Sequence, residues 1–217
     1  MSRPRPSLAS RHADLTERVI LDAAVALLER APVSKLTVRA LAARGGISER
    51  TVFRYFPARE ALLDAVLGEV MRRFDLPPDP TSVEDVLAHP EVLYARFDAA
   101  AALTKAALHS ELSHRIRSTH AQRRWDAVRA LIDRAASSRP VHERTLAAAN
   151  ICYYLSATTW HYYRFSFGFS LEQSIQCARM AIAHTLAGLG VRLPAHRTAA
   201  GRRRRRGHSP ASRWQGT

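Results

Sequence analysis

Two short helices separated by a glycine turn constrain the fold of this chain more than any other feature of its sequence. Thr37 and Ser48 each stand where a side chain can cap the start of a helix. Each has a hydrophobic residue just before it and another four positions inside the helix, the pattern of a hydrophobic staple. The pair Gly45-Gly46 ends the first helix, because glycine readily adopts the left-handed backbone that closes a helix. The sequence therefore predicts a helix-turn-helix over about residues 37–56.

The second helix of this pair has two chemically different faces. Val52 and Phe56 are four positions apart and face inward. In a helix-turn-helix, the start of the second helix lies in the major groove of DNA, where arginine can bind guanine or phosphate. A large exposed aromatic residue on this helix favours the interpretation that a partner covers the face. The alternative is a basic face that contacts only solvent. The outward residues are Glu49, Arg50, Phe53 and Arg54.

Composition indicates a globular protein of the cytoplasm. The 217 residues are 47% hydrophobic and 24% charged, which is unlike a disordered chain. The two cysteines, Cys152 and Cys177, imply no disulfide framework and fit a reducing compartment. The apolar stretches are too short to span a membrane, and the N-terminus lacks the apolar core of a signal peptide. We therefore expect a cytoplasmic protein that makes no membrane contact.

Helical periodicity without strand-like alternation predicts an all-α fold of about nine helices. Asp14 is the expected N-cap of the first helix, and Pro57 closes the third. Pro90, Pro140 and Gly168 are expected to interrupt the later helices. Beyond residues 14–28, 37–44, 48–56 and 59–74, the helices are predicted at about 83–88, 91–108, 111–137, 142–167 and 171–189.

Composition changes along the chain predict four regions. Residues 1–13, rich in proline and arginine, form a flexible N-terminal arm. Residues 14–75 form a three-helix helix-turn-helix domain that leads through a fourth helix to a proline cluster at 76–82. Residues 76–190 form a larger helical domain. Residues 191–217 form a disordered, arginine-rich tail.

The tail carries most of the excess positive charge. The net charge of the chain is +14, and residues 191–217 contain eight arginines and no carboxylate. Three interpretations remain open: a solvated by-product of GC-rich coding, a clamp that binds DNA without sequence preference, or a contact for an acidic protein.

The sequence of residues 19–70 resembles the DNA-binding domain of TetR/AcrR-type transcriptional regulators. The most specific part is LTVRALAARGGIS-x-x-TVFRYF-x-x-REALL, residues 36–63. The resemblance implies phosphate contacts from the start of the second and fourth helices, and base contacts from the third. The DNA-binding residues that it implies are Thr37, Arg39, Ser48, Arg50, Thr51, Phe53, Arg54, Tyr55 and Arg59.

Four positions depart from the family's usual pattern. Phe53 stands where tyrosine is frequent, so a hydroxyl that could bind phosphate is missing. Pro32 and Val33 replace a glycine and an aromatic residue in the first loop. Ala58 stands where a capping serine or asparagine is common, which weakens the start of the fourth helix by about 1 kcal/mol.

The resemblance also implies a regulatory and dimerisation domain. The last two long helices, about 142–189, are apolar on more than one side, and a two-fold dimer through them would bury the surplus. The second helix of each helix-turn-helix, called the recognition helix, would then lie about 34–36 Å from that of the partner subunit, which is one turn of DNA. Candidate residues for a small-molecule effector pocket are Trp125, Tyr153, Trp160, His161 and Arg164; the alternative is that they belong to the core or the dimer interface.

Neither a metal site nor an active site is predicted. His109, His114 and His120 are spaced by five and six residues, which does not give the i, i+4 geometry of paired helical ligands. The sequence has no glycine-rich phosphate loop, no Gly-x-Ser-x-Gly and no His-Glu-x-x-His motif. We therefore expect a protein that is not an enzyme and has no cofactor.

Two functional hypotheses follow. The first is a homodimeric repressor that binds a double-stranded DNA operator and is released by a small-molecule effector. The alternative is an effector-independent architectural protein, whose binding would fall with salt on any DNA. Sequence-selective binding and ligand-induced release would distinguish the first from the second.

Overall fold

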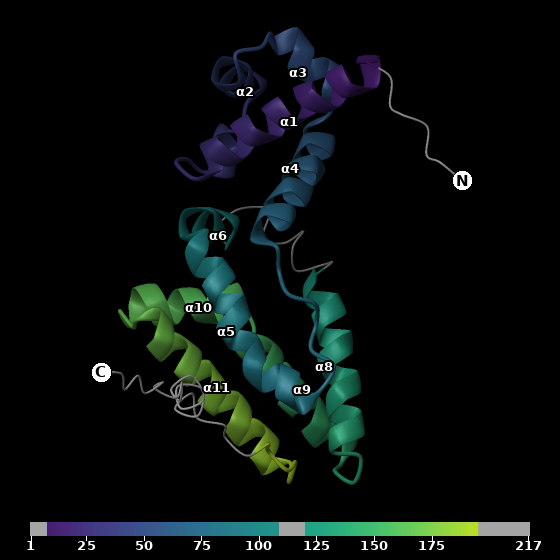
Figure 1. Ribbon diagram of the computed structural model, residues 1–217, viewed down its shortest axis with the longest axis vertical. Helices are drawn as coiled ribbons and strands as arrows, with labels where there is room; N and C mark the ends of the chain where they lie inside the picture. The colour runs from purple at the N-terminus through teal and green to yellow at the C-terminus, as the bar shows by residue number, and fades with distance from the viewer. Residues whose placement is uncertain (1–7, 109–119, 195–217) are drawn as a thin grey trace, which may run out of the picture.

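The computed structural model describes residues 8–108 and 120–194. These ranges contain ten α-helices and no strand, which confirms the predicted all-α fold. The molecule is elongated, with the first four helices at one end and the remaining helices at the other (Figure 1).

Four helices and a short 3₁₀ turn make up the N-terminal end. They are α1 (Leu8–Leu28), η1 (Val33–Lys35), α2 (Val38–Gly45), α3 (Glu49–Tyr55) and α4 (Arg59–Phe74). The other end contains α5 (Val83–Ala99), α6 (Ala101–Leu108), α8 (Gln122–Ala135), α9 (Val141–Tyr154), α10 (Ala157–His161), the π-helix η3 (Tyr162–Ser166) and α11 (Leu171–Gly188).

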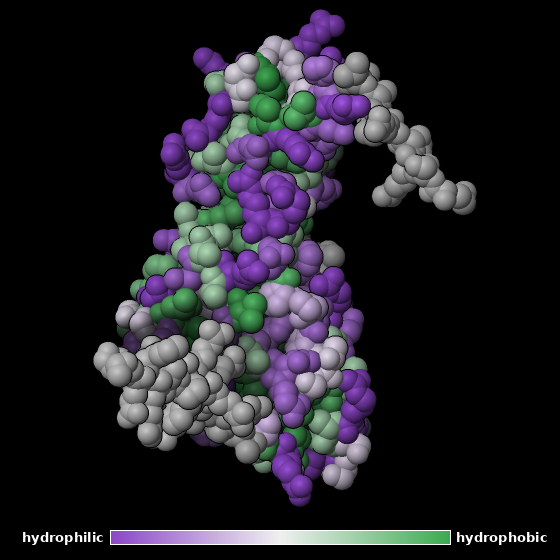
Figure 2. All heavy atoms as spheres, viewed as in Figure 1, coloured by the Kyte–Doolittle hydropathy of each residue, from purple (hydrophilic) through white to green (hydrophobic). Residues whose placement is uncertain are grey.

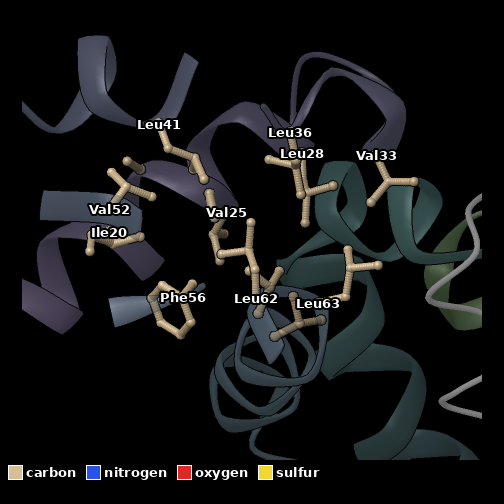
Figure 3. Close-up of a cluster of buried hydrophobic side chains, with 14 of the residues drawn as sticks. Ile20, Val25, Leu28, Val33, Leu36, Leu41, Val52, Phe56, Leu62 and Leu63 are labelled. Atoms are coloured by element: carbon tan, nitrogen blue, oxygen red, sulfur yellow. The ribbon is translucent and has the colours of Figure 1, made fainter. Parts of the chain in front are cut away.

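The N-terminal core forms where α1 meets the helix-turn-helix and α4. Ile20 and Val25 of α1 are fully buried and converge with Leu41 of α2 and Val52 of α3, while Leu63 of α4 closes the cluster (Figure 3). Fully burying a side chain of this size stabilises the fold by about 1.5–3 kcal/mol. The helix-turn-helix is therefore held in a fixed orientation on α1 and α4.

The second core lies between α5, α8, α9, α10 and α11. Leu93 and Tyr94 of α5, Ile132 of α8 and Trp160 of α10 are fully buried in it. Helix α11 packs along α5 and α9, and α8 packs along α9. Leu103 of α6 belongs instead to the N-terminal core, so α6 links the two ends of the molecule.

The predicted start of the first helix is wrong. Helix α1 begins at Leu8, so Asp14 lies inside the helix and does not cap it. After Pro6 no residue opposes helix formation, and alanine and arginine between residues 9 and 13 favour it. The arm predicted for residues 1–13 therefore includes helical residues from Leu8 onward.

Pro90 does not interrupt the chain as predicted. Helix α5 runs through it, although proline removes one backbone hydrogen bond. Val86 before Pro90 and Leu93 after it are both fully buried in the same cluster. Packing of both turns against one core outweighs the local cost, which is a tertiary effect that the sequence pattern does not contain.

Two predicted helices are each divided in the structure. The helix predicted for 91–108 breaks at Ala100, where Thr104 Oγ1 donates to the carbonyl oxygens of Phe97 and Ala100. The helix predicted for 142–167 breaks after α9, where Ser156 caps α10 and accepts from the Thr159 N–H at 3.2 Å. In both places a short polar side chain competes with the helical hydrogen bonds.

Some predictions concern other parts of the chain. His109 and His114, the start of the helix predicted for 111–137, residues 1–7 and the arginine run at 202–206 all lie outside the ranges that the structure describes. Within those ranges, no helix combines the length and the hydropathy needed to cross a bilayer.

Candidate nucleic-acid interface

The start of α2 presents a polar end to the outside of the N-terminal end. Thr37 has an extended backbone, and its Oγ1 accepts from the Ala40 N–H at 3.1 Å, which confirms the predicted cap. Because Oγ1 acts here as an acceptor, the hydroxyl hydrogen can still donate to an anion. The positive end of the helix dipole favours a phosphate at the same place.

The turn between α2 and α3 depends on its two glycines for different reasons. Gly46 has φ 64°, the left-handed conformation that favours glycine, and its N–H donates to the Ala42 carbonyl oxygen. A Cβ on Gly45 would lie 3.3 Å from Cγ1 of Val19 on α1. The turn can therefore lie close against α1, which fixes the angle between α2 and α3.

Helix α3 is capped and anchored on one side. Ser48 Oγ accepts from the Thr51 N–H at 3.1 Å, and the hydroxyls of Ser48 and Thr51 lie 2.8 Å apart. Val52 is fully buried, and Phe56 at the end of the helix is nearly so. The buried side of α3 is the predicted one, and its opposite side must face solvent.

That opposite side carries the residues predicted to contact DNA. The Phe53 side chain is 53% exposed, and Arg50 and Arg54 are exposed beside it. The Arg54 guanidinium lies 5.3 Å from the ring centroid of Tyr55, whose half-buried ring packs against the N-terminal core. The Tyr55 ring thus contacts the Arg54 guanidinium, and this contact limits the directions in which the guanidinium can point.

Arg59 has a partner within the protein. Its Nη1 donates to the Leu36 carbonyl oxygen at 3.3 Å, which ties the start of α4 to the residue just before Thr37. Arg39 is exposed in the first turn of α2. If Arg59 also contacts a phosphate as predicted, its guanidinium would bind DNA while it holds the start of α4 close to the start of α2.

The exposed charges around the helix-turn-helix are mostly positive. Hydrophilic residues cover much of this end of the molecule in the view of Figure 2. A positive surface of this kind attracts the phosphate backbone, with an affinity that falls as salt rises. The exposed basic residues of residues 35–54 are Lys35, Arg39, Arg44, Arg50 and Arg54, against a single exposed carboxylate, Glu49.

Three of the five predicted effector residues come together on α10 and η3. Trp160 is fully buried, and the centroid of its ring lies 6.4 Å from that of His161. Arg164 Nε donates to Asp98 Oδ1 at 2.7 Å, and its Nη1 donates to the Phe169 carbonyl oxygen at 2.5 Å. The charge of Arg164 is thereby neutralised by α5.

The other two lie elsewhere. Trp125 is half-buried on α8 against the second core. Tyr153 points outward from α9, with its ring 5.9 Å from that of Tyr154. Two further residues were not predicted from the sequence: Phe165, whose ring lies beside Trp160 and His161, and Lys105, whose Nζ lies over the Phe165 ring. The aromatic run at 160–169 was the available signal for Phe165.

Residues 20–66 match the family model of the bacterial regulatory proteins of the tetR family. The matched range includes all of α2 and α3, their glycine turn and the start of α4. No curated protein matches the chain. The family match agrees with the resemblance of residues 19–70 and covers the whole candidate interface from Lys35 to Arg59.

Proposed function

Because its N-terminal domain makes this chain a DNA-binding transcriptional regulator of the TetR family, we propose that it acts as a homodimeric repressor that a small molecule releases from its operator. The observation that carries the DNA-binding half of the proposal is the outward face of α3, where Phe53 is 53% exposed beside two exposed arginines. An aromatic side chain so exposed on a short, capped helix favours a surface that covers it.

Each residue of the interface has a role set by its position. Arg50 and Arg54, on the outward face of α3, contact base edges in the major groove, where arginine discriminates guanine by two hydrogen bonds. Phe53 contacts the apolar parts of neighbouring bases, and Thr51 and Tyr55 flank these contacts. Thr37, Arg39, Ser48 and Arg59 bind phosphates and set the register of the protein on the duplex.

Exposed apolar side chains on α9 and α11 support a dimer through these two helices. Leu146 and Tyr153 of α9 are 63% and 56% exposed, and Met180 of α11 is 58% exposed. Between Leu146 and Tyr153 the exposed side chains carry no charge. From Gln173 to Gly188 the one arginine, Arg179, pairs with Glu91 of α5, with 3.9 Å between Nη1 and Oε2. Depletion of charge with enrichment in tyrosine and methionine is typical of interface cores.

We assign the regulatory role to the second core. Leu76, a partly buried neighbour of both buried clusters, supports a boundary near residue 76 between the DNA-binding domain and the domain that we propose at 76–190. A ligand that alters the packing of α5, α6 and α10 would change the separation of the two recognition helices. Its coupling to DNA binding is reciprocal, so DNA weakens ligand binding equally.

Fluorescence anisotropy tests the DNA-binding half of the proposal. DNA from upstream of the protein's own gene is compared with a shuffled duplex of equal composition at physiological salt. We expect a preference of about 10³-fold or more. Arg54→Ala should remove most of it, whereas Arg192→Ala, an exposed arginine at the far end of the molecule, should not.

The architectural alternative would instead be supported if both duplexes bind with equal affinity and the logarithm of that affinity falls linearly with the logarithm of the salt concentration. In that case Arg54→Ala and Arg192→Ala would lower affinity by similar small amounts.

A further inference from the structure

The aromatic side chains of α10 and η3 form a compact group with α5. The Trp160 ring lies edge-on to Phe165, with 5.5 Å between centroids, and 5.9 Å from Phe97. His161 completes the group, 5.2 Å from Phe165. We call Phe97, Trp160, His161 and Phe165 the aromatic group.

The centre of the aromatic group contains a hydrogen-bond donor without an acceptor. Trp160 is fully buried, and within the described part of the chain its Nε1–H has no partner. Buried donors are nearly always paired, because an unpaired one loses its bond to water. Two neighbouring hydroxyls show the usual case: Tyr94 donates to the Tyr154 carbonyl oxygen at 2.6 Å, and Thr159 to that of Tyr153 at 2.5 Å.

A positive charge borders the same group. Lys105 of α6 is half-buried, and its Nζ lies 4.6 Å from the centroid of Phe165. No carboxylate of residues 8–108 or 120–194 forms an ion pair with Lys105. The neighbouring Arg164, in contrast, is neutralised by Asp98. Among the described residues, Lys105 therefore has no carboxylate partner, and a bound anion could compensate its charge.

The aromatic group can be reached from the surface through Phe165. That side chain is 46% exposed although its ring contacts the fully buried Trp160. It lies in the π-helix η3, and π-helical turns are rare and frequent at functional sites. Figure 2 shows hydrophobic residues at the surface at the level of α6 and α10. A shift of Phe165 would uncover Trp160 without unfolding a long helix.

We propose that the aromatic group is the binding site of a planar aromatic molecule that carries a carboxylate. The ring of the ligand packs against Trp160 and Phe165, and its carboxylate oxygens accept from Trp160 Nε1–H and from the Lys105 ammonium. The inference rests on the effector half of the proposed function and gives the effector a chemical class. A neutral aromatic molecule leaves Lys105 uncompensated, and an aliphatic acid lacks the planar face.

Isothermal titration calorimetry on the full chain without DNA tests the site with three probes. The first is 1-naphthoate, which is planar and anionic. The second is cyclohexanecarboxylate, which keeps the charge but is not planar, and the third is 1-naphthalenemethanol, which keeps the ring but is neutral. We expect 1-naphthoate to bind at least tenfold more tightly than either comparator, a difference of about 1.4 kcal/mol.

Two substitutions locate the binding. Trp160→Phe keeps an aromatic ring and removes the N–H donor, and Lys105→Met removes the charge and keeps the apolar stem. Each should weaken 1-naphthoate binding about tenfold, or about 1.4 kcal/mol. Lys35→Met, at the only other lysine of the chain, should leave it unchanged. Circular dichroism melting verifies that each variant folds. If Trp160→Phe does not fold, Lys105→Met, at a half-buried side chain, still tests the site.

The possible outcomes separate this inference from the proposed function. Binding of 1-naphthoate that both substitutions weaken supports the site. No binding at millimolar 1-naphthoate, or binding that neither substitution changes, overturns it. If 1-naphthoate binds but does not release operator DNA, the site stands and the release step of the proposed function is wrong. If the chain binds its operator and not 1-naphthoate, only this inference fails.

Discussion

Asp75 and Arg96 form an ion pair, with 2.9 Å between Oδ2 and Nη2, that joins the end of α4 to α5. Asp75 is also the C-cap of α4 and, within residues 8–108 and 120–194, the one non-glycine residue with positive φ, 44°. The helix that leads from the DNA-binding domain thus ends on a residue in the left-handed region, which costs roughly 1–2 kcal/mol for most side chains and less for aspartate.

Replacing Asp75 should separate the backbone cost from the ion pair. Both side chains of the pair are largely exposed, so the pair contributes at most about 1 kcal/mol. Asp75→Ala should lower the free energy of unfolding by about 1 kcal/mol, because alanine tolerates the left-handed region less well than aspartate. Asp75→Gly should stay within about 1 kcal/mol of the parent, since relief of the backbone offsets the lost pair. Urea denaturation measures both, with Arg96→Gln as the control that removes the pair alone. Equal losses in the glycine and alanine variants would show that the backbone at Asp75 is not strained.

Removing the cap of α3 should loosen the recognition helix. Ser48→Ala deletes the acceptor of the Thr51 N–H and should cost about 1 kcal/mol of stability. Thermal unfolding measures the change, and Ser138→Ala, at an exposed serine after α8, serves as the control. Unchanged stability in Ser48→Ala would mean that another group or water satisfies the Thr51 N–H equally well.

Stability should fall in mild acid because of His89. Burial, with a further contribution from the charge of Arg124, lowers the pKa of His89 from 6.5 to about 4. The unfolded chain therefore binds this proton at higher pH than the folded chain, so the stabilisation is complete above about pH 6.5 and is lost as pH falls toward 4. Between pH 7 and 5 the loss should be about 2 kcal/mol.

His89→Gln, which does not titrate, should remove this part of the pH dependence. Urea denaturation of the parent and the variant at pH 7 and pH 5 gives the comparison, and the contributions of carboxylates cancel in the difference. A parent and a variant that lose equal free energy between the two pH values would show that His89 is protonated in the folded protein as easily as in the unfolded one.

The Cys152 thiol should react slowly. Burial raises its pKa to about 11, so at pH 8 its thiolate fraction is about 100-fold lower than that of an ordinary cysteine. In the Cys177→Ser variant, where Cys152 is the remaining cysteine, the reaction with Ellman's reagent should be at least that much slower than the reaction of glutathione. The rate should become ordinary in guanidinium chloride. A fast reaction in the native protein would contradict a raised pKa of the half-buried Cys152 thiol.

Charges placed on α9 and α11 should dissociate the proposed dimer. Leu146→Glu combined with Met180→Glu puts like charges into an apolar face, and sedimentation velocity should then show a monomer at micromolar concentration. Val92→Glu, at an exposed apolar residue of α5, is the matched control and should leave the dimer intact. A dimer that survives the double substitution would place the interface on another face.

The helix-turn-helix could be predicted from sequence because local signals determine it. The caps at Thr37 and Ser48 and the left-handed Gly46 act within four residues of their own position in the chain. The side of α3 that carries Val52 could be identified from the helical period alone. In contrast, the predicted start of α1 at Asp14 is wrong, because the helix begins at Leu8. Asp14 could cap a helix, but the alanine and arginine residues before it extend the helix past that position.

The sequence by itself thus determined the all-α class, the helix-turn-helix and its exposed arginines, since each depends on hydrogen bonds and periodicity within a few residues. Only the tertiary structure decided that α5 continues through Pro90, because burial of Val86 and Leu93 in one core outweighs a missing hydrogen bond. Tertiary packing alone also brings Lys105 of α6 beside Phe165 of η3, sixty residues later in the chain. Contacts between residues so distant depend on how whole helices pack, and no local pattern encodes that packing.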